Sequence, residues 1–302
     1  MTLPSYRGRF APSPTGPLHF GSLVAAVGSY LDAKAHGGLW LVRIEDLDRP
    51  RAVPGAADAM LRTLEALGMA WDDTVLYQST RDDAYQAALD ALKKRKLVYP
   101  CACSRREIAD SAVSGIDGPV YPGTCRKGLL AGRAARAERV LTNSTRITFD
   151  DAVQGRIVHS LERQIGDFVL KRADGLYAYQ LAVVVDDAAQ GITDIVRGAD
   201  LLDSTTRQIY LQQLLGYPTP HYAHLPAAVN VMGEKLSKQT LAAPIEAANP
   251  VPILNAALDF LGQDSVTGCA PQDTQSFWQR AIAGWRINRV PRTRTLQAPA
   301  LP

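Results

Sequence analysis

The sequence predicts an α/β fold built around a parallel sheet. Short apolar runs alternate with longer segments whose apolar residues recur at helical spacing, and this alternation is typical of parallel strands joined by crossover helices. The strand-like runs are 6–11, 39–45, 168–171, 177–185, 192–196 and 222–231. The helix-like runs are 20–36, 54–67, 80–95, 203–215, 251–261 and 273–285. An irregular, cysteine-containing segment interrupts the alternation between about residues 98 and 165, and we interpret it as an insert.

Length and composition favour a soluble enzyme. The chain of 302 residues is long enough for one large or two modest domains with a real core. A net charge of +3 is too small to indicate nucleic-acid binding by itself. We find no apolar signal segment and no run of membrane-spanning length, so a cytoplasmic location and no membrane partner are expected. Residues 291–302 lack periodicity and are expected to be extended or disordered.

The first strand-like run leads into a turn that is suited to phosphate. Prolines stop the strand and stiffen the turn, and glycines let the backbone approach a ligand closely. The helix pattern starts near Phe20, so His19, Gly21 and Ser22 lie where a strand gives way to a helix N-terminus. Unpaired N–H groups and the positive end of the helix dipole favour phosphate there. The segment is Arg9-Phe10-Ala11-Pro12-Ser13-Pro14-Thr15-Gly16-Pro17-Leu18-His19-Phe20-Gly21-Ser22.

A second phosphate-handling segment follows the run 222–231, and it is Lys235-Leu236-Ser237-Lys238-Gln239. A mobile ammonium group can neutralise charge as pyrophosphate leaves ATP. The two segments together are similar to the HIGH and KMSKS signatures of class I aminoacyl-tRNA synthetases. They indicate an enzyme that activates a carboxylate with ATP.

The insert carries a candidate metal site. Cys101 and Cys103 form a Cys-x-Cys pair, and Cys125 follows after 21 further residues. In a reducing cytosol this pattern favours a metal over disulfides, and a structural zinc ion needs four ligands. Tyr121 is the nearest candidate for the fourth ligand. Two carboxylates, Asp110 and Asp117, are rivals, and Cys269 stands alone as an ordinary reduced cysteine.

Two groups of basic residues could hold a phosphate backbone, although each could equally be a solvated surface. One lies in the insert and the other near the C-terminus, where no acidic residue follows Asp273. The groups are Arg126, Lys127, Arg133, Arg136 and Arg139, and Arg280, Arg286, Arg289, Arg292 and Arg294.

Three further segments resemble glutamyl-tRNA synthetases. Arg43–Arg51 resembles their Arg-Ile-Glu-Asp-Thr-Asp segment, with Leu47 in place of threonine. Val196–Leu201 is similar to their Arg-Gly-x-Asp segment, and Tyr177–Ala182 is similar to their substrate-pocket strand. The resemblance extends from Arg7 to about Gln239, and several motifs in the right order make it specific.

The chain departs from that family after the lysine segment. Only 63 residues follow Gln239 in the chain of 302, too few for the large helical anticodon-reading region. The short form, with its Cys-x-Cys…Tyr…Cys insert, resembles glutamyl-queuosine tRNA(Asp) synthetases. This resemblance implies that glutamate is activated with ATP without tRNA. The glutamyl group is then placed on queuosine at the wobble position in the anticodon stem-loop of tRNA(Asp).

The resemblance also implies a class I synthetase fold, a Rossmann-like parallel sheet with a zinc-containing insert and a short helical C-terminal region. Residues 1–97 would form the first half of the catalytic domain, 98–165 the insert, and 166–240 the second half with the Lys-x-Ser-Lys loop. Residues 241–302 would form a short helical region with a basic tail and no anticodon-binding domain.

The implied site has Arg9 and Arg197 as carboxylate partners, since a guanidinium group binds carboxylate as a bidentate fork. Glu45 would bind the ammonium group. The glutamate-binding set is Arg9, Phe10, Ala11, Pro12, Ser13, Glu45, Tyr179 and Arg197. The ATP-binding set is His19, Gly21, Ser22, Lys235, Ser237 and Lys238, with His19 and Lys238 as the catalytic residues. Cys101, Cys103, Tyr121 and Cys125 would hold one structural Zn²⁺, and ATP would bring Mg²⁺.

Two alternatives remain open on sequence. One is a truncated glutamyl-tRNA synthetase that charges a tRNA 3′ end, and the other is a non-catalytic tRNA-binding relative. The length after the lysine segment disfavours the first, and the retained phosphate and glutamate residues disfavour the second. The pair Asp186-Asp187 is interpreted as the end of a helix or strand and receives no role.

Overall fold

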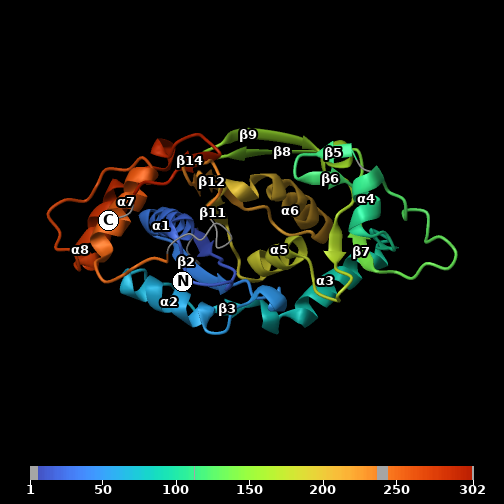
Figure 1. The fold of residues 1–302 in the computed structure, drawn as a ribbon, viewed down its shortest axis with the longest axis horizontal. Helices are drawn as coiled ribbons and strands as arrows, with labels where there is room; N and C mark the ends of the chain where they lie inside the picture. Colours follow the sequence, from blue (N-terminus) through green and yellow to red (C-terminus); the bar gives the residue numbers. More distant parts are fainter. Residues whose placement is uncertain (1–5, 112, 237–243, 301–302) are drawn as a thin grey trace.

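The computed structural model describes residues 6–111, 113–236 and 244–300. Two groups of parallel strands form its centre (Figure 1). The first group runs in the order β1 (Arg7–Phe10), β2 (Leu39–Ile44) and β3 (Leu76–Tyr77). The second runs in the order β11 (Asp194–Gly198), β12 (His221–Leu225), β8 (Arg146–Asp151) and β9 (Gly155–Ser160), with only β9 antiparallel to its neighbour.

Strand β1 joins the two groups, because it lies alongside β11. The backbone N–H of Thr193 donates to the carbonyl of Arg7 at 3.0 Å, and the N–H of Arg7 donates to Thr193 Oγ1 at 2.8 Å. The sheet is buried on both faces, as is usual for parallel strands. Leu41 and Val42, which are consecutive in β2, belong to the two different hydrophobic cores. The parallel α/β sheet predicted from the sequence is therefore confirmed.

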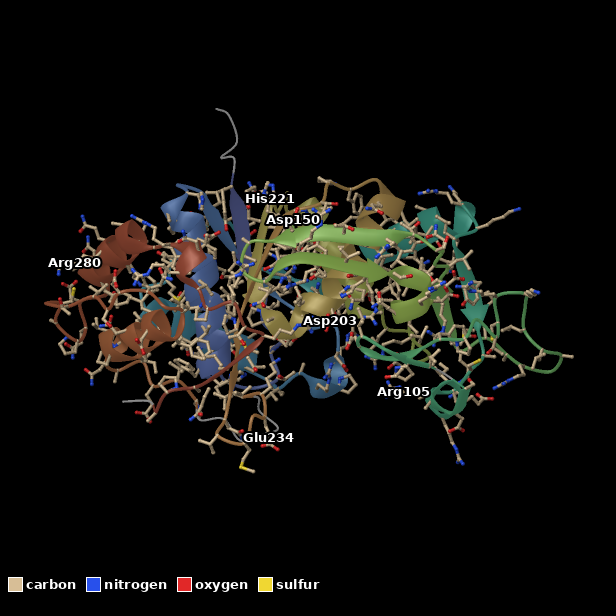
Figure 2. The ribbon with its side chains drawn as sticks, turned by 90° about the horizontal axis from the view of Figure 1, so that it is seen from above. Arg105, Asp150, Asp203, His221, Glu234 and Arg280 are labelled. Carbon is tan, nitrogen blue, oxygen red and sulfur yellow. The ribbon has the colours of Figure 1, made fainter. Side chains whose placement is uncertain are left out.

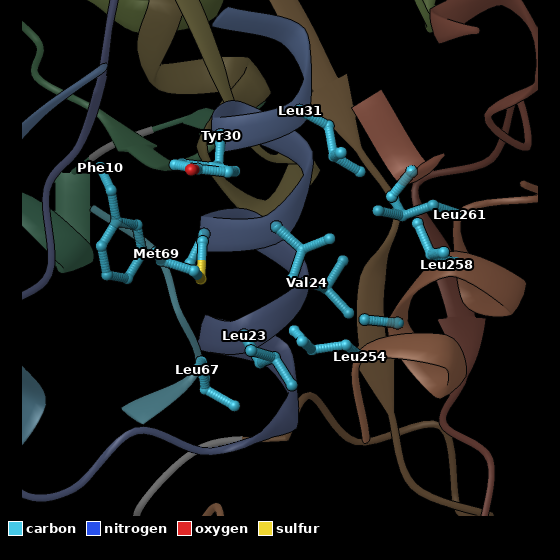
Figure 3. Close-up of a cluster of buried hydrophobic side chains, with 14 of the residues drawn as sticks. Phe10, Leu23, Val24, Tyr30, Leu31, Leu67, Met69, Leu254, Leu258 and Leu261 are labelled. Atoms are coloured by element: carbon cyan, nitrogen blue, oxygen red, sulfur yellow. The ribbon is translucent and has the colours of Figure 1, made fainter. Parts of the chain in front are cut away.

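Helices cover both faces of the sheet. The core on one face contains α1, α2, α7 and α8, and Figure 3 shows Val24 and Leu31 of α1 pointing toward Leu254, Leu258 and Leu261. The core on the other face contains α3, α5 and α6. The helices are α1 (Phe20–Ala35), α2 (Ala56–Ala66), α3 (Asp82–Lys94), α5 (Tyr179–Ala189), α6 (Leu202–Leu215), α7 (Pro250–Phe260) and α8 (Thr274–Gly284).

The cysteine-containing region lies at one end of the molecule and α7 and α8 at the other, as the positions of Arg105 and Arg280 show (Figures 1 and 2). Its elements are β4 (Val98–Cys101), α4 (Arg105–Ser111), β5 (Val113–Gly115), β6 (Gly118–Val120), β7 (Ala137–Val140) and β10 (Val169–Lys171), with β7 between β4 and β10 in one small sheet. The hairpin β8–β9, within the predicted insert, pairs with β12 of the catalytic sheet instead.

The prediction of a strand over 177–185 is wrong, since Tyr179–Ala189 form helix α5. Residues 181–187 of this helix are all buried. A helix that is buried all round has no apolar stripe, and its run of valines at 183–185 imitates a buried strand. The substrate-pocket segment expected as a strand is therefore a helix N-terminus.

The sequence predicts that the C-terminal stretch is either extended or disordered. Its described part contains an extended strand, which pairs with another strand of the protein. Strand β14 (Thr295–Gln297) runs parallel to β13 (Ala227–Val229). Pro226 separates β13 from β12, so the run predicted as one strand over 222–231 forms two. In the described parts of the chain, no helix has both the length and the apolar character needed to cross a bilayer.

Candidate active site and metal centre

A cavity of about 590 Å³ opens at the carboxyl ends of the central strands. Its walls are the segments that follow β1, β2, β11 and β12, together with the first turns of α1 and α5. Open parallel sheets bind ligands at this edge, because the loops that leave adjacent strands diverge there. Gly28 lets α1 pack closely against the sheet, since a Cβ at this position would lie 2.5 Å from Leu225 Cδ1.

The fold brings nearly all the predicted site residues to this cavity. The lining includes every residue of the predicted glutamate set: Arg9, Phe10, Ala11, Pro12, Ser13, Glu45, Tyr179 and Arg197. It also includes His19, Gly21, Ser22 and Lys235 of the predicted ATP set. Ser237 and Lys238 lie outside the described residues.

Both flanks of the segment that carries Lys238 are anchored beside the first motif. Before it, the N–H of Leu236 donates to the carbonyl of Ala228 at 2.8 Å. After it, the N–H of Ile245 donates to the carbonyl of Leu18 at 3.0 Å, and Pro244 forms an isolated bridge with His19. Lys235, Leu236 and Pro244 therefore lie close to the first motif in space, although more than two hundred positions separate them from it in the sequence.

His19 caps the N-terminus of α1. The N–H of Ser22 donates to His19 Nδ1 at 3.4 Å, and Ser22 Oγ lies 3.2 Å from His19 Nε2. His19, Gly21 and Ser22 thus line the cavity at the N-terminus of α1, where the helix dipole favours anions. A Cβ at Gly21 would lie 3.2 Å from His19 Cε1, so glycine keeps this corner open.

A buried network of alternating charges lies behind the cavity, which two of its members, Arg9 and Glu45, line. Arg9 Nε donates to Asp187 Oδ1 at 3.0 Å, and Arg43 Nη1 donates to the same oxygen at 2.8 Å. Arg43 Nη2 also donates to Glu45 Oε1 at 3.3 Å. The two guanidinium groups and two carboxylates balance in charge, which buried charges require. The edge of Arg9 formed by Nε and Nη2 therefore contacts the carboxylate of Asp187. The bidentate contact expected between Arg9 and a substrate carboxylate does not use that edge.

Asp187 and Arg43 hold two predicted site residues, Arg9 and Glu45, in this network, and neither received a role from the sequence. The sequence suggests that Asp187 caps or follows the end of a helix or strand. In the structure it is buried within α5. Two adjacent aspartates in the apolar run 181–189 were the available signal, because buried acids require charged or hydrogen-bonded partners.

The network sets the charge states of its members. Burial raises the pKa of Asp187, but Arg43 and Arg9 outweigh it and hold that pKa below its ordinary value. For Glu45 burial dominates and raises the pKa, with Arg43 and Arg9 offsetting it only in part. Burial, followed by the nearby charge of Glu45, raises the pKa of Tyr179 to about 12. Tyr179 is therefore a neutral hydroxyl donor near pH 7.

The carboxylates at the cavity mouth are engaged with protein partners. Asp46 accepts from Ser79, Asp48 pairs with Arg51 and Arg172, and Asp200 pairs with Lys235. Within the described ranges, the one group of three metal-ligating side chains is the cysteine cluster, so no such group lines this cavity. A magnesium ion that arrives with ATP would be held chiefly by phosphate oxygens.

The insert brings four metal-ligand atoms together. The sulfur atoms of Cys101, Cys103 and Cys125 all lie within 4.8 Å of one another, and the Cys103–Cys125 separation is 3.6 Å. A tetrahedral zinc ion with Zn–S bonds of about 2.3 Å places its sulfurs about 3.8 Å apart. Tyr121 Oη lies 3.4 Å from Cys101 Sγ and 3.5 Å from Cys103 Sγ. The donor set and its spacing fit a metal ion.

The rival ligands for the fourth position point elsewhere. Asp110 pairs with Arg106 at 3.8 Å and Asp117 pairs with Arg207 at 2.7 Å. Cys269 lies outside the cluster and packs against the core that contains α1. Of the candidates that the sequence left open, Tyr121 is the one beside the sulfur atoms.

Several arginines considered for a phosphate-binding surface are buried or form ion pairs with acidic side chains of the protein. Arg139 is buried, and Arg126 pairs with the buried Asp167 at 2.6 Å. In the other group, Arg289 pairs with Asp264 and Arg294 pairs with Asp203. Both interpretations of its group, a phosphate contact or a solvated surface, are wrong for Arg139, because this residue is buried with its guanidinium over the Tyr121 ring at 4.1 Å.

Comparisons with known proteins agree with this architecture. Residues 5–249 match the family described as tRNA synthetases class I (E and Q), catalytic domain. The crystal structure of a glutamate-tRNA synthetase from Elizabethkingia anophelis superimposes with a TM-score of 0.80 and 24% identity, covering 98% of this chain and 68% of that one. A glutamate tRNA ligase from Elizabethkingia meningosepticum gives a TM-score of 0.79, also at 24% identity, with coverage of 98% and 67%.

Sequence relatives match over almost their entire length. A protein of Dechloromonas aromatica is 60% identical over 297 residues, covering 98% of this chain and 99% of its own, and is named glutamyl-Q tRNA(Asp) synthetase. A protein of Aromatoleum aromaticum with the same name is 57% identical over 296 residues, covering 98% of this chain and 94% of its own.

Proposed function

Because the chain belongs to the class I (E and Q) tRNA synthetases, and within them to the glutamyl-Q tRNA(Asp) synthetases, we propose that it activates L-glutamate with ATP and transfers the glutamyl group to queuosine in tRNA(Asp). The observation that carries this proposal is the cavity itself. It joins a phosphate-binding helix N-terminus to a pocket lined by two arginines and one glutamate.

The charges of the pocket suit glutamate, which has two carboxylates and one ammonium group. Arg197 Nη1 is buried and has no hydrogen-bond partner in the described part of the chain, and Arg9 lines the same cavity. Glu45 offers a carboxylate to the ammonium group, and Tyr179 and Ser13 offer hydroxyl groups. Each charged group of the substrate thus has an opposite charge available in the lining.

In the first step, an oxygen of the glutamate α-carboxylate attacks the α-phosphorus of ATP. The bond to the β-phosphate breaks, and glutamyl-adenylate and pyrophosphate form. His19 and the first-turn N–H groups of α1 would bind phosphate oxygens, and Lys235 and Lys238 would neutralise charge on the leaving pyrophosphate. Mg²⁺, when bound to ATP, supplies further charge neutralisation. Positioning and electrostatic stabilisation suffice, and no protein nucleophile is required.

In the second step, a hydroxyl of the cyclopentenediol ring of queuosine attacks the activated carbonyl, and AMP leaves. The modified base must leave its stack in the anticodon loop to reach the cavity, as bases do when enzymes act on them. The cavity is open to solvent beside Arg51, whose side chain is 73% exposed. An exposed mouth of this kind admits a base that is still attached to its stem-loop.

We propose that the metal centre holds one structural Zn²⁺ through Cys101, Cys103, Cys125 and Tyr121. None of these residues lines the cavity. The ion would order the insert, since four ligands fill a tetrahedral site and leave no open position for chemistry.

Glutamate-dependent ATP–pyrophosphate exchange without tRNA tests activation, and transfer of labelled glutamate to queuosine-containing tRNA(Asp) tests the acceptor. Both should be positive. Transfer to bulk tRNA that lacks queuosine would instead favour a truncated glutamyl-tRNA synthetase. Absence of exchange by a folded, zinc-loaded protein would favour a non-catalytic relative.

A further inference from the structure

Two of the three guanidinium nitrogens of Arg197 in β11 donate hydrogen bonds to protein groups. Its Nε donates to His224 Nε2 at 3.0 Å, and its Nη2 donates to Thr205 Oγ1 and to Gln208 Oε1, both at 2.7 Å. Its Nη1 is buried and has no hydrogen-bond partner among the described residues, although Arg197 lines the cavity. Leaving such a donor unpaired costs free energy, so this nitrogen is suited to a ligand that supplies an acceptor.

The contact with Arg197 determines the tautomer of His224. A guanidinium nitrogen only donates, so His224 Nε2 must be the unprotonated acceptor and the ring proton must lie on Nδ1. That nitrogen faces Asp151 Oδ2 at 2.5 Å. Burial, with the charge of Arg197 also acting against protonation, lowers the pKa of His224 to about 4. The ring is therefore neutral near pH 7.

Asp151 is itself fixed by the backbone. Its Oδ1 accepts from the N–H groups of Val153, Gln154 and His224 at 3.0, 2.8 and 3.1 Å. Its other oxygen, Oδ2, is left for the His224 ring. The side chains of Asp151 and His224 are both fully buried, and neither residue lines the cavity.

We propose that Asp151 and His224 are positioning residues for glutamate, because they form a relay that turns Nη1 of Arg197 toward a substrate carboxylate. Asp151 holds the Nδ1 proton, His224 presents an acceptor to Nε of Arg197, and Arg197 faces the ligand. The relay rests on the proposed function, since it assigns the carboxylate to glutamate. Asp151, His224 and Arg197 lie on β8, β12 and β11, which are three neighbouring strands of one sheet.

Asp151→Asn tests the relay with almost no change of shape. Three N–H groups require an oxygen at the Oδ1 position, so the amide NH₂ must take the place of Oδ2. It would donate to His224 Nδ1 and force the ring proton onto Nε2, where it opposes the N–H of Arg197 Nε. We expect the KM for glutamate in pyrophosphate exchange to rise roughly tenfold to hundredfold. The KM for ATP should stay at its wild-type value.

Two substitutions of His224 give an independent test. His224→Gln keeps an acceptor near the Nε2 position and should leave the glutamate KM close to wild type, whereas His224→Leu removes it and should raise that KM as Asp151→Asn does. His221→Gln is the matched control, because His221 lies on the same strand with its side chain 89% exposed. Melting temperatures would show that each variant is folded.

The outcomes separate the two proposals. If wild-type protein shows no glutamate-dependent exchange, the proposed function is overturned. If wild type is active but Asp151→Asn keeps the wild-type glutamate KM, the relay is overturned. If Asp151→Asn does not fold, equal glutamate KM values for His224→Gln and His224→Leu would overturn the relay. A glutamate KM close to wild type for His224→Gln, together with a raised KM for His224→Leu, would support it.

Discussion

Arg9 and Asp187 form a buried ion pair although 178 positions separate them, with Arg9 Nε 3.0 Å from Asp187 Oδ1. The pair joins the first strand of the sheet to helix α5 directly beneath the cavity. Arg43 contacts the same carboxylate and also pairs with Glu45, so two carboxylates balance two arginines at the base of the site. The charges that stabilise this part of the fold therefore include two, Arg9 and Glu45, that line the cavity.

Replacing Asp187 with asparagine should destabilise the fold by about 3–5 kcal/mol, because the buried Arg9 and Arg43 would be left with Glu45 as the one remaining carboxylate of the network. The pKa of Asp187 is lowered in the folded state, so its contribution is present above the unfolded pKa of about 3.9 and is lost as pH falls through the folded value. Urea denaturation should thus show a flatter pH dependence for the variant below about pH 4. Asp264→Asn, which breaks the exposed pair with Arg289, is the control and should change stability little.

The pocket should prefer glutamate strongly over glutamine. A neutral amide would leave guanidinium charge poorly paired in a buried site, so discrimination in pyrophosphate exchange should reach at least about hundredfold. Arg197→Ala should lower the kcat/KM for glutamate by a similar factor or more while the protein stays folded. Equal activation of glutamine, or near-normal exchange by the variant, would contradict the assignment of Arg197.

The protein should contain about one zinc ion per chain. Cys125→Ala should lose the metal and destabilise the insert, as elemental analysis and thermal unfolding would show. Tyr121→Phe is the finer test, and an unchanged zinc affinity would eliminate Tyr121 as a ligand. Cys269→Ala should retain the metal, because that sulfur lies outside the cluster.

Arg139 should strengthen metal binding without touching the ion. Its Nε donates to Cys101 Sγ at 3.3 Å, and its guanidinium lies 4.1 Å from the centre of the Tyr121 ring. Arg139→Met should weaken zinc affinity roughly tenfold to hundredfold in competition with a chelator, as loss of an outer-shell partner does. Arg136→Met removes an exposed arginine of the same segment and should have no effect. Identical affinities for the two variants would refute this role.

The C-terminal strand should support adenylate formation. Strand β14 pairs with β13, and β13 leads toward Lys235. The N–H of Ala298 donates to the carbonyl of Val229 at 2.8 Å, and Arg294 pairs with Asp203. Deletion of residues 294–302 should therefore slow pyrophosphate exchange and lower the melting temperature. Deletion of 299–302 alone keeps the paired strand and should leave both unchanged. If the longer deletion exchanges normally, the tail is dispensable for the first step.

The sequence by itself did not predict strands β3, β8 and β9 of the sheet. It did predict strands β1, β2, β11 and β12, most of the helices and, through the family resemblance, the residues around the cavity. These depend on local signals: alternating strand and helix patterns, prolines that stop β1, and motifs that follow strand ends. In a parallel sheet the loops after neighbouring strands must meet at one edge. The order of the motifs was therefore enough to bring Arg9, Glu45, His19 and Arg197 together.

Only the tertiary structure decided which charges pair inside the protein. The apolar run around Asp187 signals that this residue is buried, but nothing local to Asp187 or Asp151 identifies the distant segment that supplies its partner. The valines of α5 resemble those of a buried strand, and only the tertiary contacts show that they belong to a buried helix. Arg289 and Arg294 near the C-terminus form ion pairs with Asp264 and Asp203, which belong to other segments of the chain. Ion pairs and tautomers depend on three-dimensional proximity and burial, because the strength of a charge interaction varies with distance and local dielectric and not with position in the sequence.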